Sequence, residues 1–218
     1  MSVPVIAIDG PSASGKGTVA ARVASALGFH FLDSGALYRL VALAALRART
    51  DLADEPGLAR LATAMDVAFG EGSVRLDGRE VGNDLRAEEV GAAASQVAAR
   101  PAVRQALLVR QRGFRRPPGL VADGRDMGSI VFPDAPLKVF LTADVDTRAQ
   151  RRHKQLMEKG MYAKMQDVVE ELRRRDERDS TRPVAPLKHY PDAVFLDTTG
   201  LTADQAAEKI LGWWREKS

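Results

Sequence analysis

The sequence contains no cysteine among its 218 residues. This absence excludes disulfide bonds and metal sites built on thiolates, and it is compatible with a reducing compartment. Long hydrophobic runs are missing too, because the longest uninterrupted apolar stretch, Leu40 to Leu46, is far shorter than the ~20 residues of a membrane-spanning helix. The first residues lack the basic and apolar segments of a secretory signal. We therefore expect a soluble, cytoplasmic protein with no membrane partner.

Two further features that are scarce or absent argue against nucleic-acid binding and against a GTPase. Aromatic residues make up only 6% of the chain, so a surface that stacks the bases of single-stranded nucleic acid is poorly supplied. The sole asparagine, Asn83, is followed by Asp84, so the Asn-Lys-x-Asp motif with which GTPases read guanine is absent. The chain is also short for a nucleic-acid motor, and we find no further motor elements in it.

The composition that remains indicates one globular core and a locally bound anion. A hydrophobic content of 45% is sufficient for a single core with a small additional lobe. The net charge is +3, but residues 148–182 hold 11 Lys and Arg against 7 Asp and Glu, so this segment is +4 and the remainder is −1. Such a basic segment favours an anionic ligand, either nucleic acid or a smaller phosphate compound.

Short apolar runs alternate with helical patterns along most of the chain. Runs of this length, bounded by Gly, Pro or Asp, are typical of buried parallel strands. The alternation predicts an α/β fold with a central five-stranded parallel sheet and helices on both sides, arranged in three layers. The five runs are Val5–Ile8, Phe29–Leu32, Leu120–Ala122, Leu137–Leu141 and Ala193–Leu196.

The alternation is interrupted between about residues 62 and 115. Asp77-Gly78 is a strong hairpin signal, because both turn positions tolerate positive φ. We expect residues 62–115 to form an inserted lobe with a small antiparallel sheet, and residues 1–61 and 116–218 to form the core. The expected antiparallel strands are 66–69, 73–76 and 79–81, separated in part by Gly70-Glu71-Gly72, and the helices after them are 86–99 and 101–115.

A glycine-rich loop follows the first run and precedes a helical pattern over 16–27. Gly10, Gly15 and Lys16 have the Gly-x-x-x-x-Gly-Lys spacing of a P-loop, in which backbone N–H groups surround phosphate and the lysine reaches the β- and γ-phosphates. Thr18 stands one position later than in the strict motif, a form seen in nucleoside monophosphate kinases, and its hydroxyl can orient toward magnesium. An ordinary strand-to-helix turn is the alternative. The predicted ATP-binding residues are Gly10, Pro11, Ser12, Ala13, Ser14, Gly15, Lys16, Gly17 and Thr18.

Polar residues follow two further runs, at the carboxyl edge of the predicted sheet, where open α/β folds bind ligands. Ser34 and Arg39 can hold an acceptor phosphate there, although a surface ion pair is the alternative for Arg39. Asp123 and Arg125 follow the third run. Asp123 can contact magnesium through water and Arg125 can bind phosphate, unless the aspartates of this stretch only stabilise a turn.

The basic segment contains two arginine groups of different character. Arg151 and Arg152 precede Gly160 and indicate a mobile helical lid at about 148–165, whose closure would expel water and bring both arginines to the migrating phosphoryl group. Arg148 is expected only to support the helix.

The second group, Arg175, Asp179 and Arg182, has i, i+4, i+7 spacing, which predicts one shared helix face. A solvated charged face is the alternative for this stretch.

Five stretches carry more specific patterns. They are DSGALYR at 33–39, ASQVA at 94–98, VADGRDMG at 121–128, VFPDA at 131–135 and RDSTRPVAP at 178–186. Together with the glycine-rich loop, they resemble bacterial cytidylate kinases, a family of P-loop nucleoside monophosphate kinases. The resemblance runs from the first predicted strand to about Asp197.

The resemblance implies transfer of the γ-phosphoryl group of ATP, with Mg²⁺, to CMP or dCMP by a monomer without a nucleic-acid partner. It also implies that Ser95, Arg104 and Asp126 read cytosine, since an aspartate can accept from the N4 amino group while serine and arginine donate to N3 and O2. Uracil would place a carbonyl against Asp126 and bind less well. The resemblance places Arg175 and Asp179 near the sugar and Arg182 at the phosphate, and it implies that the inserted lobe at about 62–115 binds the nucleoside monophosphate. The predicted CMP-binding residues are Ser34, Arg39, Ser95, Arg104, Arg125, Asp126, Arg175, Asp179 and Arg182, and the predicted catalytic residues are Lys16, Arg125, Arg151 and Arg152.

Two other functions remain open on the sequence. A kinase with a hydroxyl acceptor, such as a shikimate-type enzyme, would need a carboxylate to steer the hydroxyl proton, and Asp33 could supply it. A module that binds RNA through the basic segment 148–182 is the non-enzymatic alternative, against which the scarcity of aromatic residues argues.

Overall fold

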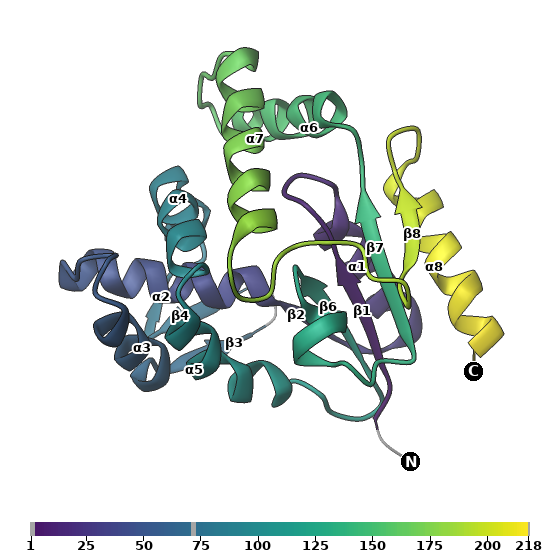
Figure 1. Cartoon of the computed structure of the whole chain (residues 1–218), viewed down its shortest axis with the longest axis horizontal. Coiled ribbons are helices and arrows are strands. Elements are labelled where there is room, and N and C mark those ends of the chain that lie inside the picture. Colours follow the sequence, from purple (N-terminus) through teal and green to yellow (C-terminus); the bar gives the residue numbers. More distant parts are fainter. Residues whose placement is uncertain (1–2, 71–72, 218) are drawn as a thin grey trace. The chain divides into compact units, whose positions relative to one another are not determined.

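The computed structural model describes residues 3–70 and 73–217, which form two compact units (Figure 1). The larger unit comprises the chain up to Leu32 and from Phe114 onward, and the smaller unit comprises Asp33–Gly113. Within the described ranges, no helix combines the length and the apolar character that crossing a membrane requires.

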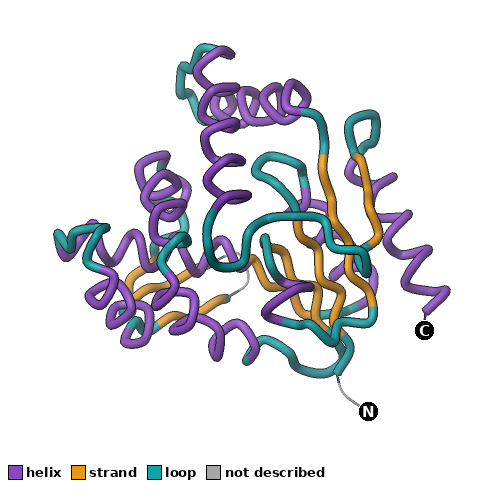
Figure 2. The backbone as a smooth tube through the Cα atoms, in the orientation of Figure 1, coloured by secondary structure: helices purple, strands orange, loops and turns teal. Residues whose placement is uncertain are grey.

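A five-stranded parallel sheet forms the centre of the larger unit (Figure 2). Its strand order is β2-β6-β1-β7-β8, so the first strand lies in the middle with parallel partners on both sides. The apolar runs predicted as strands are confirmed. Most strands extend past the apolar run onto a polar residue, such as Asp9, because the hydrogen-bonded ladder does not stop where the hydrophobic pattern stops. The strands are β1 (Val5–Asp9), β2 (His30–Asp33), β6 (Leu120–Gly124), β7 (Leu137–Thr142) and β8 (Val194–Asp197).

Two helices pack against each other and against the sheet, and together they bury a hydrophobic cluster of the larger unit. They are α1 (Lys16–Leu27) and α8 (Ala203–Lys217). Val23 of α1 and Ile210 of α8 share one buried cluster with Ile8 of β1, and all three side chains are fully inaccessible to solvent. The core therefore anchors α1 directly behind the end of β1, where the glycine-rich loop connects them.

The larger unit also contains two charged helices, α6 (Val145–Glu158) and α7 (Met165–Thr181). Ala149 and Leu156 of α6 pack with Leu172 of α7 in a small separate cluster. Arg182 lies just beyond α7 in an extended conformation (φ −60°, ψ 142°), as is common for a residue before proline. The prediction that Arg182 shares a helix face with Arg175 and Asp179 is therefore wrong.

The smaller unit combines helices with a three-stranded antiparallel sheet. The sheet has the order β3-β4-β5, and Asp77 and Gly78 turn the chain between β4 and β5 with φ of 50° and 77°, as the hairpin signal predicted. Glu71 and Gly72, also expected in a turn, lie outside the described residues. The elements are α2 (Ser34–Ala48), α3 (Glu55–Ala64), β3 (Val67–Phe69), β4 (Val74–Leu76), β5 (Arg79–Glu80), η1 (Asp84–Arg86), α4 (Glu88–Val97) and α5 (Pro101–Arg112).

The compact unit that contains residues 62–113 begins at Asp33. The reason is packing, because α2 lies against α4 and α3 lies against α5. The expectation that residues 62–115 act as a separate nucleotide-binding lobe stays a prediction. The α/β class and the separate antiparallel sheet are confirmed.

Candidate active site

The glycine-rich loop (residues 10–18) has a backbone that its glycines make possible. A Cβ on Gly10 would lie 1.9 Å from the carbonyl oxygen of Leu141 on β7, so no side chain fits there. Gly15 has φ +91° and stands directly before α1, where the helix exposes its first backbone N–H groups. The loop therefore has the shape and the polarity of an anion site.

Lys16 lies across this loop. Its Nζ donates to the carbonyl oxygen of Pro11 at 3.1 Å and lies 3.9 Å from Asp123 Oδ1. Both charged side chains are nearly inaccessible to solvent. Asp123 stands beside Ile8 in the register of β6 and β1, so the sheet itself brings the carboxylate to the loop.

The same place offers oxygen donors for a hard cation. A Cβ on Gly17 would lie 3.0 Å from Asp123 Oδ2, and the exposed Thr18 is the next residue along α1. Carboxylate and hydroxyl oxygens suit Mg²⁺, so the residues present fit this ion. The described part of the chain holds no cluster of three or more His, Cys, Asp or Glu residues that could bind a metal ion.

Arg125 joins the loop to α7. Its Nη2 donates to Ser12 Oγ and its Nε donates to Asp179 Oδ2, each at 2.9 Å. Burial raises the pKa of Asp179, but the charges of Arg125, Arg175 and Arg182 and the hydrogen bond from Arg125 outweigh it. The pKa of Asp179 therefore lies below its ordinary value, and the carboxylate is charged at neutral pH.

Arg182 is held by the turn that follows α7. Its Nε donates to the carbonyl oxygen of Ala185 at 2.6 Å, and Leu187 N donates to the carbonyl oxygen of Asp179 at 2.8 Å. The chain thus folds back on the end of α7. Although Arg182 leaves the helix, its charge still acts on Asp179.

Two arginines of α6 also bind the loop. Arg151 Nη1 donates to the carbonyl oxygen of Ser14 at 2.8 Å, and its Nη2 donates to that of Thr198 at 2.7 Å. Arg148 is buried, and its Nη1 donates to the carbonyl oxygen of Ser12 at 3.2 Å. Arg148, which we expected only to support its helix, therefore helps to fix the loop.

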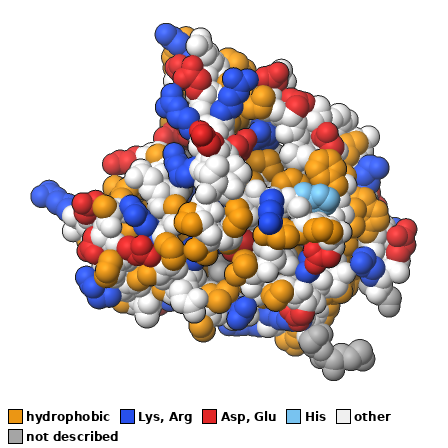
Figure 3. Space-filling model, in the orientation of Figure 1, with side chains coloured by type: hydrophobic (Ala, Val, Ile, Leu, Met, Phe, Trp, Pro, Cys, Tyr) orange, Lys and Arg blue, Asp and Glu red, His pale blue; other side chains and the backbone are white. Residues whose placement is uncertain are grey.

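Arg148 and its partner illustrate what the sequence pattern missed. Arg148 Nη2 lies 2.6 Å from Asp176 Oδ2 and Nη1 lies 3.1 Å from Oδ1, a bidentate pair across 28 residues. Asp176 follows a run of three arginines, so its pattern suggests only a charged surface. Helix α7 carries both Arg and acidic side chains, and basic and acidic side chains lie close together on the surface (Figure 3). Arg148 is thus paired within the basic segment itself.

Asp126 and Asp9 meet at η2 (Met127–Val131), a short π-helical turn. Asp126 is buried, and its carbonyl oxygen accepts from Ile130 N and Val131 N. Asp9 Oδ1 accepts from Met127 N at 2.7 Å and Oδ2 accepts from Gly128 N at 2.9 Å. Burial raises the pKa of Asp9 to about 6, against these hydrogen bonds, and the nearby Asp126 charge adds to the rise. The sequence offered one signal for Asp9, a carboxylate directly before the glycine-rich loop.

In the smaller unit, α2 presents the first predicted acceptor residues. Asp33 caps α2 by accepting from Ala36 N, and Ser34 is buried at the first helical position. Arg39 Nη1 donates to the carbonyl oxygen of Leu85 at 2.8 Å, and a Cβ on Gly91 would lie 3.1 Å from this nitrogen. Gly91 therefore gives the guanidinium room beside α4.

Ser95 and Arg104 are buried polar residues on α4 and α5 of the same unit. Arg104 Nη1 donates to the carbonyl oxygen of Ala98 at 3.0 Å, and its guanidinium carbon lies 5.5 Å from the centre of the Tyr38 ring. The roles of all these residues stay predictions.

Comparison with known proteins identifies the family. The family model described as cytidylate kinase matches residues 6–216. A curated cytidylate kinase from Chromobacterium violaceum is 60% identical over 217 residues, which cover 100% of this chain and 98% of that protein. One from Bordetella bronchiseptica is 59% identical over 214 residues, with 98% and 96% covered.

A solved structure of an uncharacterized protein from Eubacterium ventriosum matches 96% of this chain and 97% of that chain with a TM-score of 0.52. Because the sequence identity is 12%, this likeness supports the fold alone. The family model and the relatives of about 60% identity cover nearly the whole chain. The chain therefore belongs to the cytidylate kinase family and is a kinase.

Proposed function

We propose that the protein transfers the γ-phosphoryl group of ATP to CMP or dCMP and so produces ADP and CDP or dCDP, a step of pyrimidine nucleotide metabolism. The observation that supports this most directly is the hydrogen-bonded series Ser12–Arg125–Asp179. It joins the glycine-rich loop, predicted to bind ATP, to residues predicted to bind CMP. A phosphoryl transferase needs its donor and acceptor residues in such fixed relation.

The glycine-rich loop binds the phosphates of ATP in this proposal. Backbone N–H groups at the start of α1 and the Lys16 ammonium supply the positive charge. Thr18 and Asp123 would hold a magnesium ion, directly or through water, and that ion would neutralise phosphate charge. Arg151, which already binds the carbonyl oxygen of Ser14, stands beside the same loop.

The acceptor is recognised by its base, its sugar and its phosphate. Asp126 accepts from the cytosine N4 amino group, while Ser95 and Arg104 donate to N3 and O2. Asp179 accepts from a sugar hydroxyl, with Arg175 beside it. The acceptor phosphate is held by Ser34, Arg39, Arg125 and Arg182.

No residue needs to act as a general base. The second pKa of a phosphate monoester is near 6, so the attacking oxygen of CMP is largely ionised at neutral pH. The difficulty is the approach of two polyanions, and fixed cations on both sides remove it. Catalysis by Lys16, Arg125, Arg151 and Arg152 then consists of in-line alignment and stabilisation of charge in a loose transition state.

One assay tests this function. Purified protein with ATP and magnesium is given CMP, dCMP, UMP, AMP or shikimate, and ADP formation is followed in a coupled reaction. We expect rapid turnover with CMP and dCMP and a lower kcat/KM with UMP. Turnover with shikimate and none with CMP would refute the proposal and favour the hydroxyl-acceptor alternative. Size-exclusion chromatography of the same sample tests the expected monomer.

A further inference from the structure

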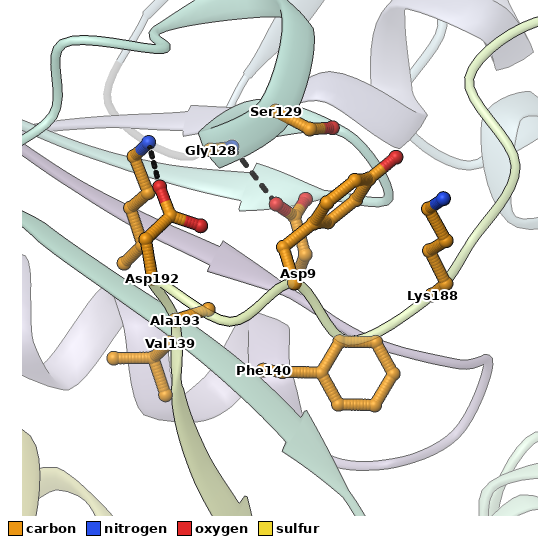
Figure 4. Close-up of a pocket in the computed structure, with 10 residues that line it drawn as sticks. Asp9, Gly128, Ser129, Val139, Phe140, Lys188, Asp192 and Ala193 are labelled. Carbon is orange, nitrogen blue, oxygen red and sulfur yellow. Dashed lines mark hydrogen bonds and ion pairs between the residues drawn. The ribbon is translucent and has the colours of Figure 1, made fainter.

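Asp9 binds two backbone N–H groups in a part of the chain far from it in sequence. It ends β1 directly before the glycine-rich loop, is half-buried, and its two carboxylate oxygens accept from Met127 N and Gly128 N. Figure 4 shows the carboxylate of Asp9 directed at Gly128. Two acceptors thus meet two donors, and each oxygen has its own N–H partner.

These two N–H groups are the first of η2, and such groups have no partner within their own helix. An aspartate at the N-cap usually binds them with its own side chain. Asp126 occupies the N-cap of η2 but makes no such bond. Asp9 supplies the cap instead, so the Asp126 side chain is not needed for it.

The backbone that directly follows Asp126 is held by two sets of hydrogen bonds. The carbonyl oxygen of Asp126 accepts from Ile130 N and Val131 N at 3.0 and 3.2 Å. The next two N–H groups, of Met127 and Gly128, donate to the Asp9 carboxylate. The direction of the Asp126 side chain therefore depends on the bonds that Asp9 accepts.

We propose that Asp9 is a positioning residue for base selection, which caps η2 in place of Asp126 and so keeps the Asp126 carboxylate directed at the N4 amino group of cytosine. This inference rests on the proposed function, because it assumes that Asp126 reads the base.

The surroundings of Asp9 consist of a small cavity and several polar and charged side chains. The small cavity beside it has a volume of about 10 Å³, room for about one water molecule, and is lined by Ser129, Lys138, Lys188, Tyr190 and Asp192 among others. The Lys138 ammonium is bound to Asp192. The charges of Arg125 and Asp126 also act on Asp9. Within residues 3–70 and 73–217, the carboxylate that accepts from Met127 N and Gly128 N is that of Asp9.

The variant Asp9→Asn tests the inference. Asparagine keeps the shape but has one acceptor where two N–H donors need two, so one N–H loses its bond. We expect kcat/KM for CMP, divided by that for UMP, to fall about tenfold, with the KM for ATP unchanged. If the cap had only a structural role, Asp9→Asn would lower the stability of the protein and would change kcat/KM for CMP and for UMP equally.

Asp54→Asn is the matched control. Asp54 caps α3 with one oxygen, which accepts from Gly57 N at 3.0 Å. Asparagine caps a helix as well as aspartate does, so this variant should keep the CMP-to-UMP ratio. A folded Asp9→Asn protein that also keeps the ratio overturns the inference.

Asp126→Ala separates this inference from the proposed function. If Asp126→Ala loses the preference for CMP while Asp9→Asn keeps it, the inference fails and the function stands. If Asp126→Ala keeps the preference, base reading by Asp126 fails, and the inference fails with it.

A measurement on the unmodified protein decides the matter if Asp9→Asn does not fold. Protonation of Asp9 also removes an acceptor, so the CMP-to-UMP ratio should fall as pH falls through about 6. CMP and UMP carry the same phosphate group, so the titration of that phosphate near pH 6 cancels in the ratio. A ratio that is constant from about pH 7.5 to about pH 5 overturns the inference.

Discussion

Removal of the Asp179 carboxylate should destabilise the protein because it leaves the buried positive charge of Arg125 without its paired carboxylate. The Asp179 and Arg125 side chains are 8% and 17% exposed, and Asp179 Oδ2 lies 2.9 Å from Arg125 Nε. In Asp179→Ala the Arg125 guanidinium keeps its hydrogen bonds to two neutral acceptors, Ser12 Oγ and the carbonyl oxygen of Gly124, while the charges of Asp123 and Asp9 still act on it without a hydrogen bond. Loss of one partner of a buried pair costs ~3–5 kcal/mol. Because Arg125 keeps two bonds and some exposure, we expect the free energy of unfolding to fall by about 3 kcal/mol.

Urea unfolding at neutral pH measures this change, with Glu158→Ala as the control. Glu158 pairs with Lys154 on α6 at 3.9 Å, and these side chains are 63% and 80% exposed. An exposed pair of this kind is worth less than about 0.5 kcal/mol. The double variant Arg125→Ala/Asp179→Ala should be less destabilised than the sum of the two single variants, since neither charge is then left alone.

If Asp179 binds the sugar as proposed, the same variant should raise the KM for CMP at least about tenfold, because the sugar hydroxyl would lose its acceptor. A different outcome would refute the reasoning. If Asp179→Ala is no less stable than Glu158→Ala, Arg125 does not depend on Asp179 for its charge compensation. If the KM for CMP is also unchanged, Asp179 has no part in binding the acceptor.

Three further predictions concern the strand that leads into the loop and the loop itself. Lys16→Ala should lower kcat by about a thousandfold with little change in CMP affinity, and an unchanged kcat in steady-state kinetics would contradict its role. Gly10→Ala should lower the free energy of unfolding by more than about 2 kcal/mol, because its Cβ would meet the Leu141 carbonyl oxygen at 1.9 Å, whereas Gly200→Ala, with open space around it, should be nearly neutral. The pKa of Asp9 is raised from 3.8 to about 6, so the folded state binds the proton more tightly. Its stability contribution should therefore be present below about pH 4 and lost, by up to about 3 kcal/mol, as pH rises to about 6, a slope that unfolding of Asp9→Asn should lack.

The parts of the fold that the sequence predicted depend on local signals. Apolar runs marked the strands of the parallel sheet, and Asp77-Gly78 marked the hairpin of the small sheet. The glycine-rich loop was recognisable because glycine is required wherever φ is positive or backbones approach closely, as at Gly10 and Gly15. Such signals lie within a few residues of the structure that they specify.

The parts that it did not predict depend on distant partners. The bonds from Met127 and Gly128 to Asp9 span more than a hundred residues, and no local pattern announces them. Arg182 is a different case, because Pro183 is a local signal that ends the helix, and this signal overrides the i, i+7 spacing.

The net positive charge of segment 148–182 predicts a basic zone, but it does not reveal the role of the acidic residues in that segment. Two arginines bind Ser12, Arg148 through the carbonyl oxygen and Arg125 through the hydroxyl. Each is paired with a carboxylate of α7, Asp176 for Arg148 and Asp179 for Arg125. These carboxylates are three residues apart and lie on one face of the helix. A loop that binds a polyanion needs cations close by, and buried cations need compensation. One turn of α7 provides it, so the acidic residues of this segment are as much a part of the site as its arginines.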